Sequence, residues 1–231
     1  NIGTDQPTLE IATGKQTESC KLSAINHKQA FDVVSDILNR KSENAEPIEA
    51  VGHRVVHGGE LFKNPTKIND DVIAGIESCI PLAPLHNPAS LSGIHAAQKR
   101  FPSIPHVAVF DTAFFSTMPP RAYLYAIPKE LYTEKGIRRF GFHGSSHEYV
   151  ARRCADLLRV DFARFSCITC HLGNGVSLSA VENGQCIDTT MGFTPLEGVA
   201  MGTRSGDIDP GLIFHLVREG MTVNEIENIL Q

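Results

Sequence analysis

The residues best suited to chemistry lie in the stretch from His171 to Asp209, which opens with the turn Gly173-Asn174-Gly175 and later carries Arg204. Turns flanked by glycine leave backbone N–H groups uncovered, and phosphates bind at such places. Arginine is always charged, and its planar guanidinium binds two anionic oxygens at once. This stretch therefore predicts a site at which an arginine meets a phosphate-binding turn.

Three further residues lie where ligand-binding side chains are often found. Arg54 interrupts an apolar run between glycines and histidines. It fits either a solvent-facing residue of an edge strand or a site residue, and its neighbours favour the site. Asp111 follows the apolar run 107–110, and open α/β folds bind ligands at the carboxyl ends of strands. His143 precedes a predicted helix, so it lies near the positive end of a dipole that attracts phosphoryl groups.

The elements that position these residues show both strand and helix patterns. We expect strands near Leu9–Ile11 and Lys21, a strand that starts at Ile48 to Val51 and leads into residues 52–59, and a strand at 107–110. We expect helices at about 26–44, 70–80 and 87–100. Asn-Gly pairs at 174–175 and 183–184 predict an antiparallel meander of three strands between residues 165 and 190. The segment 191–211 has neither the helical nor the strand period of apolar residues. A loop of this length in a compact domain is usually functional.

Capping residues mark the starts of several helices. Asn87 followed by Pro88 predicts a cap and a first helical residue. Ser145-x-x-Glu148 forms a capping box for a helix that would leave His147 at the surface. The apolar face of that helix would consist of Val150, Cys154, Leu157 and Leu158. Asp209-Pro210 and Thr222-x-x-Glu225 predict two last helices, with Leu212, Ile213, Leu216 and Val217 on the apolar face of the first.

Composition limits the class of protein. The chain has 231 residues and a formal charge of −5, so no basic field favours nucleic acid as a partner. No apolar run has the length of a membrane span, and no signal segment opens the sequence. The six cysteines are dispersed, and Cys167 and Cys170 would point to opposite faces of a strand, which makes a poor metal chelate. We expect buried free thiols in a reducing cytoplasm.

Several other motifs are incomplete. Asp207-x-Asp209-x-Gly211 lacks the remaining ligands of a calcium loop, and Gly144-Ser145-Ser146 lacks the spacing of a nucleophile elbow. Neither a Walker A lysine motif nor G-x-G-x-x-G is present. Ten histidines keep a metal-dependent hydrolase as a minor alternative.

Six segments in consistent order resemble the motifs of the acetate/propionate/butyrate kinase family. They are 53–59 (HRVVHGG), 83–88 (APLHNP), 109–114 (VFDTAF), 142–147 (FHGSSH), 171–175 (HLGNG) and 201–210 (MGTRSGDIDP). The resemblance runs from about Ile48 to Gln231, and the residues before Ile48 match only loosely.

The resemblance implies the two-domain α/β fold of acetate and sugar kinases, the Hsc70 ATPase and actin, with mixed sheets and flanking helices. Residues 1–113 would form a partial N-terminal domain and residues 114–231 a partial C-terminal domain. The implied reaction moves the γ-phosphoryl of ATP to the carboxylate of a short acid by direct in-line transfer and is reversible. Mg²⁺ is the implied cofactor, and the implied form is a cytoplasmic homodimer.

The same resemblance assigns roles to individual residues. Arg54 and Arg204 match the arginines for the carboxylate and the moving phosphoryl group, and Asp111 matches the catalytic aspartate, with metal binding as a further role. His143 matches the histidine that stabilises the phosphoryl group. Other matches are His86 and His171 as active-site histidines, Val56, Leu85, Phe142 and Pro195 as walls of the acid's pocket, and Gly173, Asn174 and Gly175 as a phosphate-binding turn.

The sequence also departs from the family pattern. The opening Asn-x-Gly-Ser-Ser-Ser strand would precede Asn1, and the adenosine motif and a Mg²⁺-associated glutamate would follow Gln231. Phe115-Ser116 stands where the family usually has His-Gln. Two hypotheses therefore remain, part of an acid kinase or a truncated, non-catalytic fragment. For a kinase, Val56 favours acetate, since relatives that prefer propionate tend to have alanine there.

Overall fold

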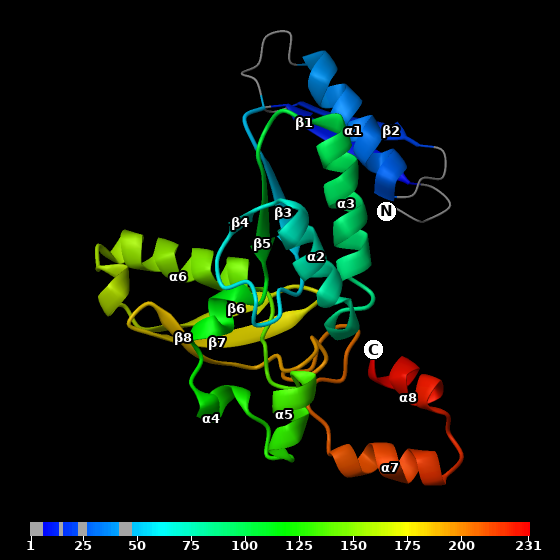
Figure 1. Ribbon diagram of the computed structural model, residues 1–231, viewed down its shortest axis with the longest axis vertical. Helices are drawn as coiled ribbons and strands as arrows, with labels where there is room; N and C mark the ends of the chain where they lie inside the picture. The colour runs from blue at the N-terminus through cyan, green and yellow to red at the C-terminus, as the bar shows by residue number, and fades with distance from the viewer. Residues whose placement is uncertain (1–6, 14–15, 23–26, 42–47) are drawn as a thin grey trace.

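The computed structural model describes residues 7–13, 16–22, 27–41 and 48–231, and its centre is a three-stranded sheet (Figure 1). Strand β5 (His106–Phe110) lies in the middle, with β3 (Val51–Val55) parallel on one side and β4 (Thr66–Lys67) antiparallel on the other. Burial alternates along β5, as expected for side chains on two faces. The apolar run 107–110 is therefore a strand that ends at Asp111, as predicted.

Helices α2 (Asp70–Ser78) and α3 (Asn87–Arg100) pack on this sheet and form the main core. The core residues are Val55, Ile68, Val72, Ile76, Leu91, Ile94, Ala108 and Phe110. Asn69 caps α2 by accepting a hydrogen bond from Val72 N. The turn η2 (Ile80–Leu82) joins the two helices.

The first described part of the chain forms a hairpin and a helix. Strands β1 (Thr8–Thr13) and β2 (Gln16–Lys21) are antiparallel, with Leu9 opposite Cys20. Helix α1 (His27–Lys41) runs beside α3 (Figure 1), and Arg100 bonds Asp36 at 2.9 Å between them. These elements confirm the predicted strands near Leu9 and Lys21 and the helix that follows.

The second half of the chain contains the predicted meander. Strands β6 (Cys167–Leu172), β7 (Val176–Glu182) and β8 (Gln185–Thr189) are antiparallel in that order. Asn183 and Gly184 both have positive φ, 51° and 73°, which is the twist that a two-residue hairpin needs. Gly173 to Gly175 form a looser three-residue turn between the paired residues Leu172 and Val176. The turn η4 (Phe162–Arg164) leads into β6.

Short helical segments connect the two sheets. The turn η3 (Ala113–Thr117) packs on β8 and on α6 (Gly144–Leu158), and it is followed by α4 (Pro120–Tyr123) and α5 (Lys129–Lys135). Phe115, Met118 and Cys186 form a second small core there. Phe115, which stands where the family usually has histidine, is therefore an apolar core residue with 1% exposure.

Helix α6 differs from the prediction in its cap and in its buried face. The helix begins at Gly144, so Ser145 lies inside it and the predicted capping box is absent, while Glu148 bonds Arg152 instead. Its buried residues are Gly144, His147, Ala151 and Ala155, whereas Val150, Leu157 and Leu158 are exposed. Small side chains bring α6 close to β6 and η3, so the predicted apolar face and the surface position of His147 are both wrong.

The chain continues through the irregular segment 190–209 to α7 (Pro210–Arg218) and α8 (Val223–Leu230). Asp209 caps α7, and Thr222 with Glu225 forms the predicted capping box of α8. Ile226 and Leu230 of α8 are buried. The predicted apolar face of α7 is not buried within the described chain, since Leu212, Ile213 and Val217 are all exposed.

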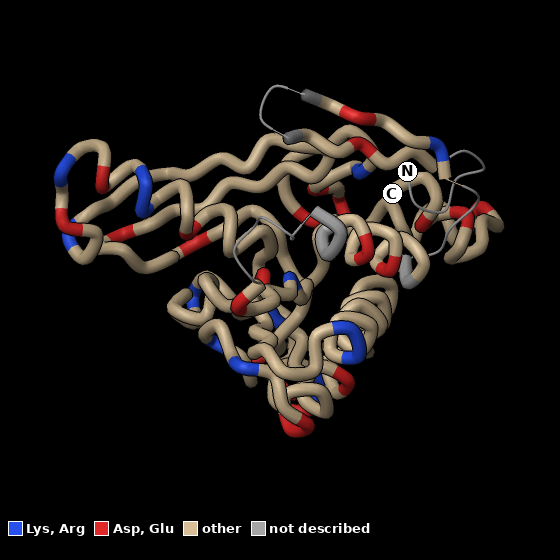
Figure 2. The backbone as a smooth tube through the Cα atoms, turned by 90° about the horizontal axis from the view of Figure 1, so that it is seen from above, with Lys and Arg blue, Asp and Glu red and all other residues tan. Residues whose placement is uncertain are grey.

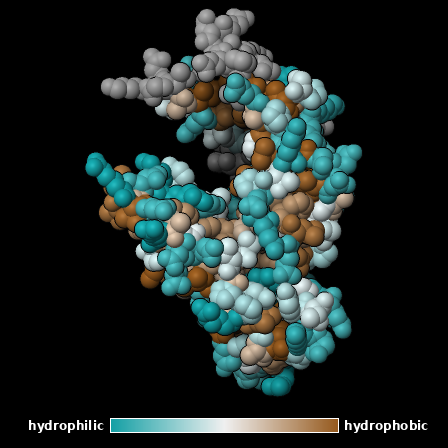
Figure 3. Space-filling view, turned by 60° about the vertical axis from the view of Figure 1, so that its left-hand side comes forward, coloured by the Kyte–Doolittle hydropathy of each residue, from teal (hydrophilic) through white to brown (hydrophobic). Residues whose placement is uncertain are grey.

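The surface mixes polar, charged and apolar residues. Basic positions are scattered over the backbone and do not gather on one face (Figure 2), and hydrophilic and hydrophobic residues are interspersed over the face seen in the space-filling view (Figure 3). Among the cysteines only Cys79 and Cys186 are buried, so the expectation of buried thiols is wrong for Cys20 and Cys170, which are exposed. No helix in the described ranges is long and apolar enough to cross a membrane.

Candidate active site

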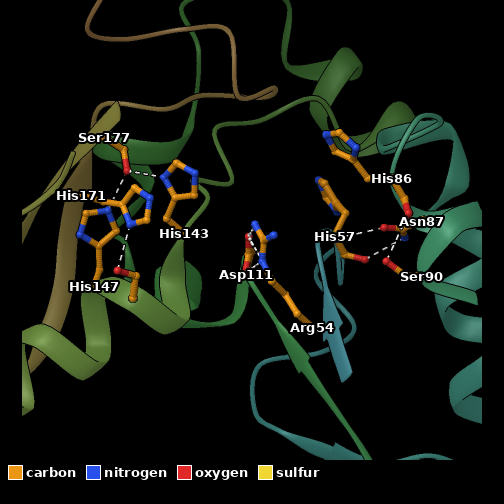
Figure 4. A network of polar contacts seen from close by, with 11 residues as sticks. Arg54, His57, His86, Asn87, Ser90, Asp111, His143, His147, His171 and Ser177 are labelled. Carbon is orange, nitrogen blue, oxygen red and sulfur yellow. Dashed lines mark hydrogen bonds and ion pairs between the residues drawn. The ribbon is translucent and has the colours of Figure 1, made fainter. Parts of the chain in front are cut away.

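Arg54 and Asp111 form an ion pair at the carboxyl ends of β3 and β5 (Figure 4). The Arg54 guanidinium donates from Nε to Oδ1 at 3.0 Å and from Nη2 to Oδ2 at 2.6 Å. This hydrogen bond to Asp111 raises the pKa of Arg54, and burial opposes the effect. Arg54 is on an edge strand of the sheet, yet it is held at the site and does not simply face solvent.

The backbone of Asp111 fixes the start of α6. Its N–H donates to Val55 O at 2.9 Å, and its carbonyl accepts from Gly144 N at 2.9 Å. A Cβ atom on Gly144 would collide with that carbonyl oxygen, so the close approach requires glycine. The end of β5 and the start of α6 are thus joined directly, which places His143 beside the ion pair.

His143 lies immediately before α6 with a φ of 62°, in the left-handed region that is uncommon for residues other than glycine. Its ring stacks on that of His171, with centroids 4.0 Å apart, and its Nδ1 contacts Ser177 Oγ at 2.9 Å (Figure 4). Burial, and then the nearby His171, lower the pKa of His143 to about 4. At neutral pH the ring is therefore uncharged and has one N–H to donate.

The predicted turn and the predicted arginine loop meet at His143. A Cβ atom on Gly175 would lie 3.3 Å from His143 Nε2 and 3.4 Å from Arg204 Nη1. A Cβ atom on Gly202 would lie 3.1 Å from Asn174 Oδ1, so the loop also passes close to the tip of the turn. Arg204 is fixed by a bond from Nη1 to Pro195 O at 2.9 Å.

A pocket of about 590 Å³ brings most of the predicted acid-binding residues together. Val56, Leu85, His86, Phe142, Pro195 and Arg204 all line it. Phe142 is buried, while Leu85 at the rim is 75% exposed. A second hollow of about 730 Å³, between β5, η3 and α6, is lined by none of the predicted site residues.

A partly buried polar cluster anchors the loop that carries Pro195 and Arg204. Arg139 donates from Nη2 to Glu197 at 2.5 Å, and the Tyr125 hydroxyl donates to the other oxygen of Glu197. Arg139 Nη1 also donates to the carbonyl groups of Thr189 and Thr190 at 3.0 and 3.1 Å. Burial and then Glu197 raise the pKa of Tyr125, so its hydroxyl stays a donor.

Two buried residues near the site differ from the prediction made from the sequence, which placed Asn87 as a helix cap and gave His57 no role. Asn87 is the first residue of α3 and does not cap it, because its side chain is buried and bonds His57 N, His57 O and Ile76 O. His57 is fully buried against Phe140, and burial lowers its pKa to about 4. In the described chain its Nε2 has no hydrogen-bond partner. His57 lies in the segment 53–59 and Asn87 in the segment 83–88, but neither segment by itself indicates that these side chains are buried.

The described residues do not favour a metal-dependent hydrolase. No group of three or more His, Cys, Asp or Glu side chains lies within metal-binding distance in the ranges that the structure describes. Both oxygens of Asp111 already accept bonds from Arg54. The pair is a poor resident site for Mg²⁺, which prefers several oxygen ligands and retains water.

The fold and the site define an α/β protein in which arginines and the neutral His143 lie beside a glycine turn. A sequence profile of the Acetokinase family matches residues 2–231, and the chain belongs to this family. It is 54% identical over 220 residues to an acetate kinase of Shewanella loihica (strain ATCC BAA-1088 / PV-4), covering 94% of this chain and 55% of the relative. An acetate kinase of Caldanaerobacter subterraneus subsp. tengcongensis is 51% identical over 224 residues, covering 95% and 56%.

Solved structures give the same result for the fold. The chain is similar to Porphyromonas gingivalis acetate kinase with a TM-score of 0.90 and 42% identity, covering 99% of this chain and 59% of that one. A propionate kinase from Francisella tularensis subsp. tularensis SCHU S4 gives a TM-score of 0.92 and 44% identity, covering 100% and 59%. The predicted fold class is therefore confirmed. The chain spans a little over half the length of the relatives that it matches.

Proposed function

We propose that the whole protein moves the γ-phosphoryl group of ATP to the carboxylate of acetate, giving acetyl phosphate and ADP in a reversible reaction. The observation that carries this proposal is the pocket whose apolar walls, Val56 and Phe142, lie in the same cavity as the Arg204 guanidinium. A short acid would place its alkyl group on the walls and its carboxylate near the cations. The names of the family and of the relatives support the same reaction.

The site residues fit direct in-line transfer. Phosphoryl transfer spreads negative charge over equatorial oxygens, so catalysis is mostly positioning and electrostatic stabilisation. We assign Arg54 and Arg204 to the carboxylate and the moving phosphoryl group, and neutral His143 to donate a hydrogen bond. Because a carboxylate nucleophile is already ionised at neutral pH, it needs no general base. Asp111 then orients Arg54 by accepting hydrogen bonds from Nε at both carboxylate oxygens and from Nη2 at Oδ2.

Further residues would bind the nucleotide and the acid. We assign the turn Gly173-Asn174-Gly175 and His171 to the phosphates of ATP, and His86, Leu85 and Pro195 to the acid's pocket. Because the oxygens of Asp111 are occupied by Arg54, we infer that Mg²⁺ enters as part of the Mg²⁺–ATP substrate, held through phosphate oxygens and water.

A propionate kinase is the alternative within the same family, and one structural neighbour carries that name. The size of Val56 favours acetate, since each extra methylene in a hydrophobic pocket changes discrimination by about 1–3 kcal/mol. Comparable kcat/KM for acetate and propionate would reject the preference for acetate.

The organisation of the whole protein is also a proposal. We place a domain boundary between residues 113 and 114, after the first residue of η3, the turn that packs on β8 and α6. We infer a cytoplasmic homodimer, in agreement with six unpaired cysteines, and sedimentation of the intact protein would test the dimer. A non-catalytic fragment is the alternative, and an intact natural mass of 25.2 kDa would support it.

The activity is tested by assaying the longest natural form with ATP and a panel of short acids, and by replacing Arg204 with alanine. If Arg204 stabilises the transferred group as a single oxyanion donor does, Arg204→Ala lowers kcat by about 10²–10³. Unchanged turnover in this variant would exclude the assigned role. Phosphorylation of none of the acids by the wild-type protein would exclude the proposed function.

A further inference from the structure

Behind His143 lies a continuous series of hydrogen-bonding groups that reaches into the buried interior, and Figure 4 shows its first members, Ser177 and His147. Thr169 Oγ1 contacts His147 Nδ1 at 2.7 Å, His147 Nε2 contacts Ser177 Oγ at 2.8 Å, and Ser177 Oγ contacts His143 Nδ1 at 2.9 Å. The residues behind His143 are shielded from water, with exposures of 4% for Thr169, 1% for His147 and 0% for Ser177. Each of these buried polar groups must therefore find its hydrogen-bond partners within the series.

The hydrogen bonds in this series can run in only two consistent directions. A hydroxyl has one proton to donate, and a neutral imidazole has one donor nitrogen and one acceptor nitrogen. If Thr169 donates to His147, then His147 donates to Ser177. In the described chain the hydrogen-bond contacts of Ser177 Oγ are His147 Nε2 and His143 Nδ1, so its own proton goes to His143 Nδ1, and the proton of His143 lies on Nε2. In the opposite direction His143 donates from Nδ1 to Ser177, and its Nε2 is a bare acceptor.

Thr169 selects the direction because it is the far end of the series. Among the described residues, the other acceptor in contact with its hydroxyl is Ser179 O, at 3.5 Å. That distance is well beyond a normal O–H···O hydrogen bond, whereas 2.7 Å to His147 is close to the optimum. The hydroxyl proton of Thr169 therefore goes to His147 Nδ1, and every donor in the series then points toward His143.

The free nitrogen of His143 faces the site. Its Nε2 is 3.3 Å from the position that a Cβ atom of Gly175 would occupy, and Arg204 Nη1 is 3.4 Å from the same point. Stacking on His171 at 4.0 Å restricts rotation of the ring. The pKa of about 4 leaves His143 neutral near pH 7, so the position of its single proton decides whether it donates or accepts.

We propose that Thr169, His147 and Ser177 are positioning residues that fix His143 in the tautomer protonated on Nε2, so that the neutral ring donates to an anionic oxygen beside the Gly173–Gly175 turn. Only the identity of this anion as a phosphoryl group rests on the proposed function. An anionic oxygen would be repelled by a bare nitrogen lone pair. The direction of the hydrogen bonds behind His143 therefore decides whether this residue helps or hinders anion binding beside the turn.

The tautomer is measured by long-range ¹H–¹⁵N correlation NMR on the intact protein with ring-¹⁵N-histidine, near pH 7. Spectra of His143→Gln and His147→Gln assign the two rings. We expect His143 protonated on Nε2 in the wild type and in Thr169→Ser, which keeps the hydroxyl. Thr169→Val has nearly the same shape without the donor, and we expect it to give the Nδ1 tautomer or a mixture.

A wild-type His143 protonated on Nδ1 would overturn the proposal, whether or not the variants fold. An unchanged tautomer in folded Thr169→Val would overturn it as well. In the enzyme assay, Thr169→Val should lower kcat on the order of tenfold, the effect of losing the partner that orients a functional histidine. KM should change little and Thr169→Ser should restore kcat. If His143 shows the expected tautomers but no acid is phosphorylated, the proposed function is wrong, whereas the positioning of His143 by Thr169, His147 and Ser177 is confirmed.

Discussion

Arg54 and Asp111 meet across the ends of two adjacent parallel strands, but they differ strongly in exposure. The Asp111 side chain is 1% exposed, whereas that of Arg54 is 63% exposed. A buried carboxylate without a cation carries a large desolvation cost, while an exposed guanidinium without a carboxylate is solvated by water. The pair is therefore asymmetric, and Asp111 depends on Arg54 more than Arg54 depends on Asp111.

This asymmetry predicts unequal costs for the two single substitutions. Arg54→Met leaves the buried carboxylate without its partner and should lower the free energy of unfolding by about 1–3 kcal/mol. Asp111→Asn removes the buried charge and should cost less, while the double variant should be more stable than the sum of the single changes predicts. Urea titrations at neutral pH measure all three. A larger loss for Asp111→Asn than for Arg54→Met would contradict the argument.

The cluster of Arg139, Tyr125 and Glu197 predicts that Gly192 is essential. A Cβ atom on Gly192 would collide with the Glu197 carboxylate, which holds the loop carrying Pro195. Gly192→Ala should displace this loop and with it Arg204, which bonds Pro195 O. We expect kcat to fall on the order of tenfold or more, since small misplacements of catalytic groups have large effects, and the stability to fall by about 1–3 kcal/mol.

Gly93 provides a matched control for this substitution. It is exposed in α3, and a Cβ atom there would contact nothing within 4 Å. Gly93→Ala should leave kcat unchanged and raise stability by about 0.5–1 kcal/mol, because glycine is unfavourable inside a helix. Equal kinetics for the two variants would show that the cluster does not position Arg204.

The sequence was informative where local patterns and tertiary contacts agree. The strand before Asp111, the Asn183-Gly184 hairpin and the capping box of α8 were all predicted, because each depends on residues a few positions apart. The motif residues around Arg54, His143 and Arg204 are brought to one region of the structure. Their roles in catalysis stay predictions.

The buried face of α6 was not accessible from periodicity. The helix has two stripes at helical spacing, and the stripe with larger apolar residues is exposed, with Leu157 at 75%. The stripe with Ala151 and Ala155 is buried because small residues allow close packing on β6 and η3. His147 lies on that stripe, and only its tertiary partners Thr169 and Ser177 reveal its position.

The apolar pocket predicts how acid specificity depends on Val56. Val56→Ala removes two methyl groups from the pocket wall, so kcat/KM for propionate relative to acetate should rise on the order of tenfold. Leu85→Ala is the comparison, since Leu85 lines the same pocket but is 75% exposed at its rim, and should change the ratio less. Competition between the two acids in one assay measures the ratio directly. A larger effect from Leu85→Ala would place the alkyl group at the rim instead.

Three histidines, two of them buried and His143 half-buried, predict that acid destabilises the fold. Burial lowers the pKa of His57, His143 and His147 to about 4 each, whereas an unfolded histidine titrates near 6.5. Between these values the unfolded state binds more protons than the folded state, so stability falls as the pH falls from about 6.5 to about 4. Each histidine contributes at most about 1.4 kcal/mol per pH unit, and stability should not depend on these groups above about pH 7.

The contribution of one histidine can be separated by comparing the wild type with His57→Gln. His57 is fully buried and lies outside the hydrogen-bonded group of His147, Ser177 and His143, and Gln keeps an oxygen that can accept from Gly59 N in place of the ring Nδ1. Gln does not titrate, so the loss of unfolding free energy between about pH 6.5 and about pH 5 should be smaller in the variant. Urea titrations at several pH values give this slope. An identical slope in both proteins would mean that His57 is protonated equally in the folded and unfolded states.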